Sequence, residues 1–361
     1  MKNLNWKKLV NIGVGLLVVV LYVVYFIFTL SLKRDSVFTV IGFSMLGLLS
    51  AYVITAIFHE IGHLVFGAIT KLKLCYFQFF GVRVSKKDDG KISISLQKDG
   101  VLGETAFYPS NGDDVAKKIG LTALGGPIFT FIQTIVYLVI SIVFMENTAI
   151  FCVFGISFVV PLYVFLINII PFSYDYDGAI VLTMLSGGKK AIIASSCITA
   201  SALIYKGEEP YNVSGRYLTT YDENYDFFSV KVIHLRYLSS LINNEETAFK
   251  ELDKISDKDK LPDGTYGDVI YELLFRALIL GDEEYIKENK DEVLDYLAMD
   301  DSPTSIRVQV ALCIYEGDYQ RADLLIKSGI ETCATYPVLG IAKFEKQMLE
   351  KFSQALEQAQ S

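Results

Sequence analysis

The sequence predicts an α-helical multi-pass membrane protein with four or five transmembrane helices, a small membrane-associated β-meander and a C-terminal all-α, helical-repeat-like cytosolic domain. Two observations support this fold class. Four apolar runs in the first half of the 361 residues are each long enough to cross the ~30 Å hydrocarbon core of a bilayer. Residues 1–205 carry 16 Lys+Arg and 11 Asp+Glu, whereas residues 206–361 carry 17 and 30. We therefore expect a membrane domain over 1–205 and a soluble domain over 206–361.

The four apolar runs predict membrane spans at about 9–32, 37–70, 121–144 and 149–170. The first run is too long for a signal-peptide core and lacks a small-residue cleavage site, so a transmembrane helix is favoured. The third run contains Gly125-Gly126-Pro127, which allows another backbone to approach closely and favours a kink. Packing and function are equally good explanations of this triplet on spacing alone.

Residues 75–108 change from a helical to an alternating pattern. Val82 and Val84 alternate with polar residues, and a second apolar alternation runs over 92–96. Asp-Gly pairs at 89–90 and 99–100 separate these runs and are typical of tight turns. The pattern predicts a three-stranded β-meander held against the membrane, with a simple connecting loop as the alternative.

The distribution of Lys and Arg predicts the orientation in the membrane. Basic residues crowd the N-terminus and the segment 71–118, which holds nine of them, so both are expected in the cytoplasm. The 15 weakly apolar residues of 191–205 are short for a span and predict an amphipathic helix on the cytoplasmic surface. A fifth crossing there is the alternative. We expect a bacterial cell-membrane protein with both termini in the cytoplasm.

The acidic C-terminal half has a helical pattern throughout. Three similar stretches, 242–248, 280–286 and 316–322, recur at intervals of 36 to 38 residues. They resemble the turns of tetratricopeptide-type hairpins, with a degenerate helical bundle as the alternative. We expect this half to dock a protein partner, and no nucleic acid. The five cysteines show no paired spacing, which argues against disulfides or a cysteine-based zinc site, and the isolated His234 is interpreted as a helix-face residue.

The second apolar run contains the residues with the clearest chemical meaning. His59 and His63 lie four residues apart, so on a helix they share one face and can hold one Zn²⁺, with Glu60 beside them as a general base. The pattern fixes only three positions and can arise by chance. However, two histidines and a glutamate inside an apolar run are costly unless they have a function. The predicted topology brings Asp177 to the same membrane face as both histidines.

Three motifs together resemble the site-2 protease family of intramembrane zinc metalloproteases. They are Phe-His-Glu-Ile-Gly-His at 58–63, Gly-Gly-Pro at 125–127, and Asn168 followed by Pro171 and by Asp177-Gly178. They occur in the family's order and cover roughly residues 40–190. The Asn-to-Asp distance of nine residues is slightly longer than the commonest form, and no PDZ-like insert is evident between the second and third spans.

The resemblance implies zinc ligation by His59, His63 and Asp177 and activation of water by Glu60. Asp175 is a rival ligand two residues before Asp177, and Asn168 is a candidate substrate or oxyanion contact with a helix-end structural role as the alternative. Zinc is the implied cofactor. The expected function is hydrolysis of peptide bonds in transmembrane or membrane-proximal protein substrates within the lipid bilayer.

Two other function classes compete with this interpretation. One is a membrane-anchored interaction or scaffold protein that keeps a vestigial zinc site, and the presence of Glu60 argues against it. The other is a small-solute transporter, which is disfavoured by the small number of spans and the absence of internal symmetry.

Overall fold

The computed structural model describes residues 6–32, 36–86, 92–96, 103–109, 114–174, 176–220, 225–262 and 264–360. The chain forms two compact units, Met1–Ile192 and Ile193–Ser361. The division falls within helix α7 (Gly188–Lys206), upstream of the boundary at 205 that the charge distribution indicates.

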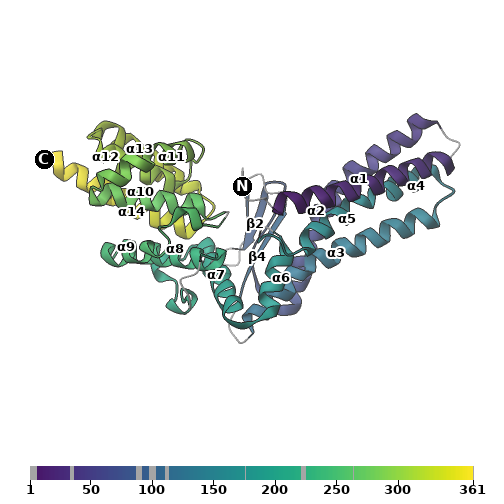
Figure 1. Cartoon of the computed structure of the whole chain (residues 1–361), viewed down its shortest axis with the longest axis horizontal. Coiled ribbons are helices and arrows are strands. Elements are labelled where there is room, and N and C mark those ends of the chain that lie inside the picture. The colour runs from purple at the N-terminus through teal and green to yellow at the C-terminus, as the bar shows by residue number, and fades with distance from the viewer. Residues whose placement is uncertain are drawn as a thin grey trace. The chain divides into compact units, whose positions relative to one another are not determined.

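Long apolar helices dominate the first unit. Four stretches are long and apolar enough to cross a membrane, and they are Leu9–Leu32, Val37–Thr70, Val115–Val143 and Thr148–Ile169. They correspond to helices α1 (Trp6–Leu32), α2 (Val37–Thr70), α3 (Val115–Val143) and the pair α4 (Thr148–Ser157) and α5 (Val159–Ile169), which run side by side (Figure 1). All four predicted runs are thus confirmed as helical, although α3 starts before residue 121 and the last run is divided at Phe158.

The sequence of α2 explains how it packs. Its inward face repeats small or polar residues at helical spacing, including Ser44, Gly47, Ala51 and Thr55. This face packs against α3 and α4, while large apolar side chains such as Phe38 point outward. Small residues allow close helix contact without a hydrophobic driving force, as is typical of helices surrounded by lipid. The polar side chains of α2 therefore lie in the helix–helix contacts and not on its apolar outer face.

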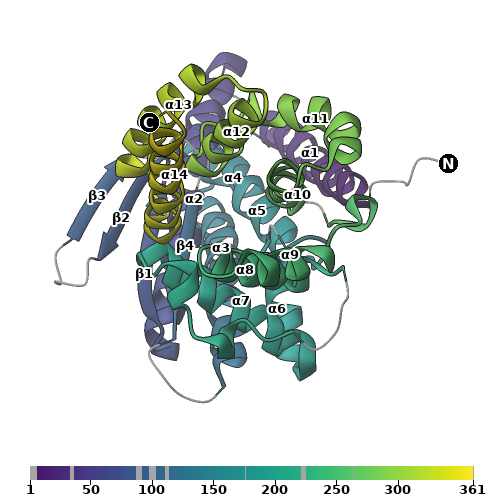
Figure 2. The same ribbon diagram turned by 90° about the vertical axis from the view of Figure 1, so that its left-hand side faces the viewer.

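The sheet of the first unit has four antiparallel strands, not the three predicted. They are β1 (Lys73–Phe79), β2 (Val82–Lys86), β3 (Ile92–Leu96) and β4 (Gly103–Tyr108), in the order β3-β2-β1-β4 (Figure 2). Strands β1, β2 and β3 pair in sequence order as a meander. The prediction is wrong about the fourth strand, because β4 returns to pair with β1, so β3 and β4 lie at opposite edges. The Asp-Gly pairs at 89–90 and 99–100 lie outside the described residues.

The missed first hairpin has a physical explanation. Phe79 pairs with Val82, which leaves Phe80 and Gly81 as a two-residue turn with φ of 46° and 74°. Two-residue hairpin turns of this kind need positive φ, for which Asn-Gly or Asp-Gly is the usual sequence. A phenylalanine at positive φ is uncommon, so Phe-Gly carries little sequence signal for a turn.

The second unit consists mainly of helical hairpins. Three pairs follow one another, namely α8 (Phe227–Leu241) with α9 (Glu245–Asp253), α10 (Tyr266–Leu280) with α11 (Glu283–Leu297), and α12 (Pro303–Tyr315) with α13 (Tyr319–Thr335). Helix α14 (Leu339–Gln360) packs on α12 and α13. Short 3-10 helices cover Pro210–Asn212, Gly215–Tyr217 and Lys258–Lys260.

The three similar sequence stretches are confirmed as the turns of these hairpins. Asn244, Asp282 and Asp318 each cap the second helix of a pair by accepting a hydrogen bond from a backbone N–H three residues later. Such caps satisfy one of the free N–H groups at a helix start and stabilise it by about 1 kcal/mol. The repeated local chemistry explains why the stretches look alike.

A charged network lies in the core of this second unit. Arg307 is 0% exposed and donates hydrogen bonds to Glu272 at 2.6 Å and to Glu345 at 2.7 Å. Tyr237 donates to the other oxygen of Glu272 at 2.8 Å. His234 lies on α8 with its Nε2 3.8 Å from Glu272. The buried charges are paired, although Arg307 Nη1 and His234 Nε2 make no hydrogen bond. Losing one charged partner would therefore be costly.

Helix α7 does not form the amphipathic surface helix that the sequence predicts. From Ile193 onward it belongs to the second unit, where Ala200 and Ile204 pack with Val213 and Leu218 in a buried cluster. Its apolar residues therefore serve a protein core. The five cysteines are free and buried, in agreement with the expected absence of a disulfide framework.

Candidate metal centre

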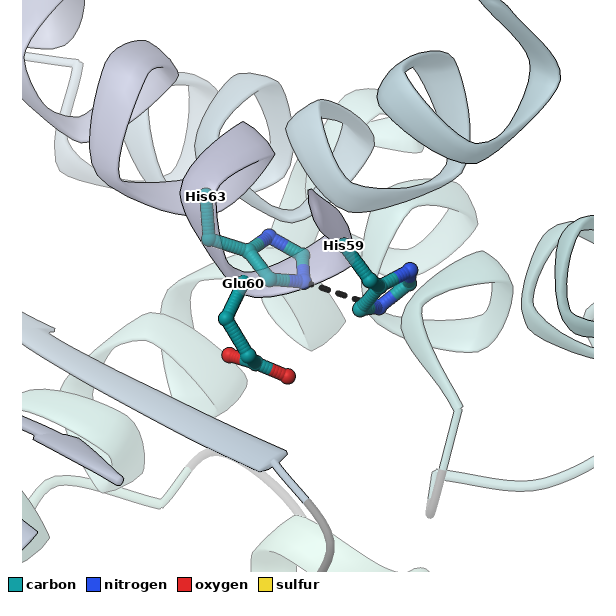
Figure 3. A group of neighbouring side chains, drawn as sticks. All are labelled: His59, Glu60 and His63. Carbon is teal, nitrogen blue, oxygen red and sulfur yellow. Dashed lines mark hydrogen bonds between the residues drawn. The ribbon is translucent and has the colours of Figure 1, made fainter. Parts of the chain in front are cut away.

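Helix α2 places two imidazoles next to each other near its C-terminal end, with their ring planes at 82°. His59 and His63 are 8% and 7% exposed, and their Nε2 atoms are 3.2 Å apart (Figure 3). The spacing of four residues brings them to the same face of the helix, as the sequence predicts. The Nδ1 atom of His63 lies 2.9 Å from the carbonyl oxygen of Thr122 on α3. A carbonyl can only accept, so Nδ1 carries the hydrogen and the neutral ring keeps a free lone pair on Nε2.

Helix α6 (Asp177–Ser186) brings a carboxylate to the same point. Asp177 is its first residue, where a negative charge also complements the helix dipole. The Oδ2 atom of Asp177 is 3.0 Å from His59 Nε2 and 3.4 Å from His63 Nε2. Helix α6 packs on α3, with Met184 against Gly120. The fold therefore brings together three predicted ligands, although more than a hundred residues separate Asp177 from the histidines.

The spacing of these three atoms suits a small tetrahedral cation. Zinc bonds of ~2.0–2.1 Å in tetrahedral geometry place ligand atoms about 3.3 Å apart, and the observed separations run from 3.0 to 3.4 Å. Asp177 Oδ2 is buried and makes no hydrogen bond of acceptable geometry, despite its closeness to both rings. Burial alone would raise the pKa of Asp177, but the two imidazoles hold it below its ordinary value. The residues fit zinc.

Glu60 lies beside this group and not within it. The possible ligand atoms of His59, Glu60 and His63 lie within 4.8 Å of one another, a looser grouping than the one that includes Asp177. Glu60 is 5% exposed, and its Oε2 accepts a hydrogen bond of 2.5 Å from Thr105 on β4. Figure 3 shows its carboxylate next to the two imidazoles. The distances therefore group Asp177, and not Glu60, with the two imidazoles.

The Gly-Gly-Pro triplet of α3 lies directly against the centre. A Cβ atom on Gly125 would be 2.3 Å from the carbonyl oxygen of Gly62, and one on Gly126 would be 2.5 Å from His63 Nε2. Neither position has room for a side chain. The triplet therefore allows α3 to approach the site closely, while Pro127 lies within the continuous helix.

Two other predicted residues have a different outcome. Asn168 donates from Nδ2 to the carbonyl oxygen of Val164 at 2.9 Å, within its own helix α5. This hydrogen bond is the kind expected for a structural role at the end of a helix. A contact of Asn168 with substrate stays a prediction. Asp175 lies outside the described residues.

Sequence reasoning missed Thr105 and Thr122, which hold Glu60 and His63. No local motif marks either threonine, because each contact joins segments more than forty residues apart.

In comparisons with family models, curated proteins and solved structures, no match to the chain was found.

Proposed function

We propose that this chain is a zinc-dependent intramembrane endopeptidase, which hydrolyses peptide bonds of transmembrane or membrane-proximal proteins. The observation that carries the proposal is the convergence of His59, His63 and Asp177 at 3.0 to 3.4 Å, with the buried Glu60 alongside. A two-histidine, one-carboxylate set leaves a fourth position open, which is typical of catalytic zinc sites. When bound, zinc would polarise the scissile carbonyl and lower the pKa of a water molecule.

Glu60 is the proposed proton carrier. Its carboxylate accepts a proton from the attacking water as the water oxygen bonds to the scissile carbonyl carbon. The same proton then passes to the amide nitrogen as the C–N bond breaks, so the products are a carboxylic acid and an amine. Burial of Glu60 in the helix pack excludes bulk water from competing for this proton.

The membrane setting determines what the substrate must do. Four helices are long and apolar enough to cross a bilayer, and α2 carries the site at one end. A substrate helix hides its peptide bonds in i→i−4 hydrogen bonds and must unwind before attack. β4 pairs with β1 on one side and has no strand on its other side among the described strands. We propose that the unwound segment adds to this edge.

An apolar hollow of about 430 Å³ between the end of α5 and α6 suits such a substrate. It is lined by residues from the end of α5 and from α6, including Ile169, Pro171, Gly178, Val181, Leu182 and Leu185. Gly178 directly follows Asp177 in α6, so we propose that this hollow holds an apolar side chain of the substrate.

The second unit is proposed to dock substrate or a partner protein in the cytoplasm. Its consecutive helical hairpins support this, because stacked hairpins present extended surfaces to other proteins. The same feature favours the second candidate function, a membrane-anchored scaffold with a vestigial zinc site.

Glu60→Gln separates the two functions. Wild type and Glu60→Gln would be purified in detergent as full-length chains. The zinc content of each and its hydrolysis of a membrane-protein substrate would be measured. Glu146→Gln is the matched control, since Glu146 is exposed between α3 and α4. An endopeptidase predicts that Glu60→Gln keeps zinc and loses about 10²- to 10⁴-fold in rate, with Glu146→Gln unaffected.

Comparative membrane proteomics of wild type and Glu60→Gln would identify the substrate as a protein that accumulates uncleaved in the variant. If no membrane protein accumulates uncleaved in Glu60→Gln relative to wild type, the scaffold function is favoured.

A further inference from the structure

A side chain of strand β4 contacts Glu60, the candidate base, directly. The Oγ1 hydroxyl of Thr105 donates a hydrogen bond to Oε2 of Glu60 at 2.5 Å. Both groups belong to the first unit, but they come from the sheet and from α2, 45 residues apart. A hydrogen bond to an ionised carboxylate is among the stronger ones in proteins, and this one is shielded by the burial of Glu60.

Two further contacts fix the position of Thr105. Gly103, Thr105 and Phe107 alternate along β4 and so share one face of the strand. A Cβ on Gly103 would lie 2.7 Å from Oε1 of Glu60, and a Cβ on Gly67 of α2 would lie 2.3 Å from the ring of Phe107. The strand is therefore seated against α2 on both sides of Thr105, and the hydroxyl has a defined place.

We propose that Thr105 is a positioning residue for Glu60, an inference that rests on the proposed function. The donated hydrogen bond fixes Oε2 and leaves Oε1 to accept the proton of the attacking water. Without the bond, the flexible glutamate side chain can turn among several rotamers, most of which point the carboxylate away from the metal centre. The sheet thus sets the orientation of the base as well as offering an edge to substrate.

Threonine is well suited to this task. Its branched Cβ restricts χ1 and favours a strand, so the hydroxyl is held in one direction. Valine has the same shape without the hydroxyl, and serine keeps the hydroxyl without the branch. This pair of substitutions separates the hydrogen bond from the packing.

The experiment compares full-length wild type, Thr105→Val, Thr105→Ser and Thr134→Val in detergent. Thr134 is a matched control, because it is buried in α3 and its hydroxyl bonds to the carbonyl of Thr130 in the same helix. Zinc content, thermal stability, kcat and KM would be measured for each. We expect Thr105→Val to lower kcat by about 10- to 100-fold with KM, zinc content and stability unchanged. Thr105→Ser should restore most of kcat, and Thr134→Val should match wild type.

Two results would overturn the inference alone, in a wild type that hydrolyses substrate. One is a Thr105→Val variant with wild-type kcat. The other is a variant that loses zinc or thermal stability in parallel with rate, which would make Thr105 a structural link between the sheet and α2. A wild type that binds no zinc and hydrolyses nothing would overturn the proposed function and this inference together.

Discussion

Replacing Gly126 by alanine tests whether the close approach of α3 shapes the metal centre. The added Cβ would lie 2.5 Å from Nε2 of His63 and 2.6 Å from Nε2 of His59. Ordinary contacts are roughly 1 Å longer, so one or both rings must move by several tenths of an ångström. Zinc ligands tolerate about 0.2 Å of error in bond length, so a displacement of this size should weaken metal binding.

The magnitude follows from two opposing effects. Overpacking of a tight interior costs about 1–3 kcal/mol, while alanine in place of glycine stabilises a helix by about 1 kcal/mol. The net change in the free energy of unfolding should therefore be about 2 kcal/mol or less. If the overpacking strain is relieved by moving the imidazoles, zinc affinity should fall by roughly 5- to 150-fold.

The assay is a competition titration of zinc against a chelator, together with thermal unfolding in detergent. Gly42→Ala is the matched control, because a Cβ on Gly42 of α2 would meet nothing within 4 Å. We expect Gly42→Ala to bind zinc like wild type. Wild-type zinc affinity in Gly126→Ala would refute the placement of α3 against both histidines.

Four further predictions concern separate parts of the molecule. Asp177→Asn should lose zinc and Asp175→Asn should keep it, and the opposite ranking in metal analysis would exclude the ligand set. Arg307→Met leaves two buried carboxylates without their cation and should lower the free energy of unfolding of the second unit by about 3–5 kcal/mol, measured by hydrogen exchange of α10 and α12. Burial raises the pKa of Tyr336 from 10.0 to about 12. As pH rises, Tyr336 therefore loses its proton in the unfolded chain before it does so in the folded unit, and the free energy of unfolding of the second unit should fall between those pH values. The check is a pH titration of tyrosinate absorbance, in which the late rise in absorbance should coincide with unfolding. A cysteine introduced at the exposed Asp259 should resist a membrane-impermeant thiol reagent in intact cells if the second unit is cytoplasmic, with little background from the five buried native cysteines.

The parts of the fold that were predictable are those with strong local patterns. Apolar runs determine the long helices, because a stretch such as Val37–Thr70 has few alternatives to a helix once it is that long and that apolar. The hairpin turns of the second unit were predictable because Asp282 and Asp318 cap helices through nearby backbone groups. The two histidines were predictable because four-residue spacing has a direct meaning on a helix.

The unpredicted parts depend on contacts between distant segments. Strand β1 is buried at both Cys75 and Tyr76, so its apolar residues do not alternate and give no strand pattern. Pairing of β4 with β1 decides the sheet order and brings Thr105 to Glu60, and neither follows from local propensity. The core role of α7 was missed because its apolar residues are packed by helices that come later in the chain.

The separation of the ligands along the chain has a consequence for synthesis of the protein. A growing chain that has emerged only as far as α3 contains both imidazoles but not Asp177, which begins α6. Two histidines alone hold zinc weakly, so firm capture of the proposed zinc would wait until α6 has docked on α3. Each newly made copy of the proposed enzyme would therefore remain unable to cut neighbouring membrane proteins until its helix bundle is complete.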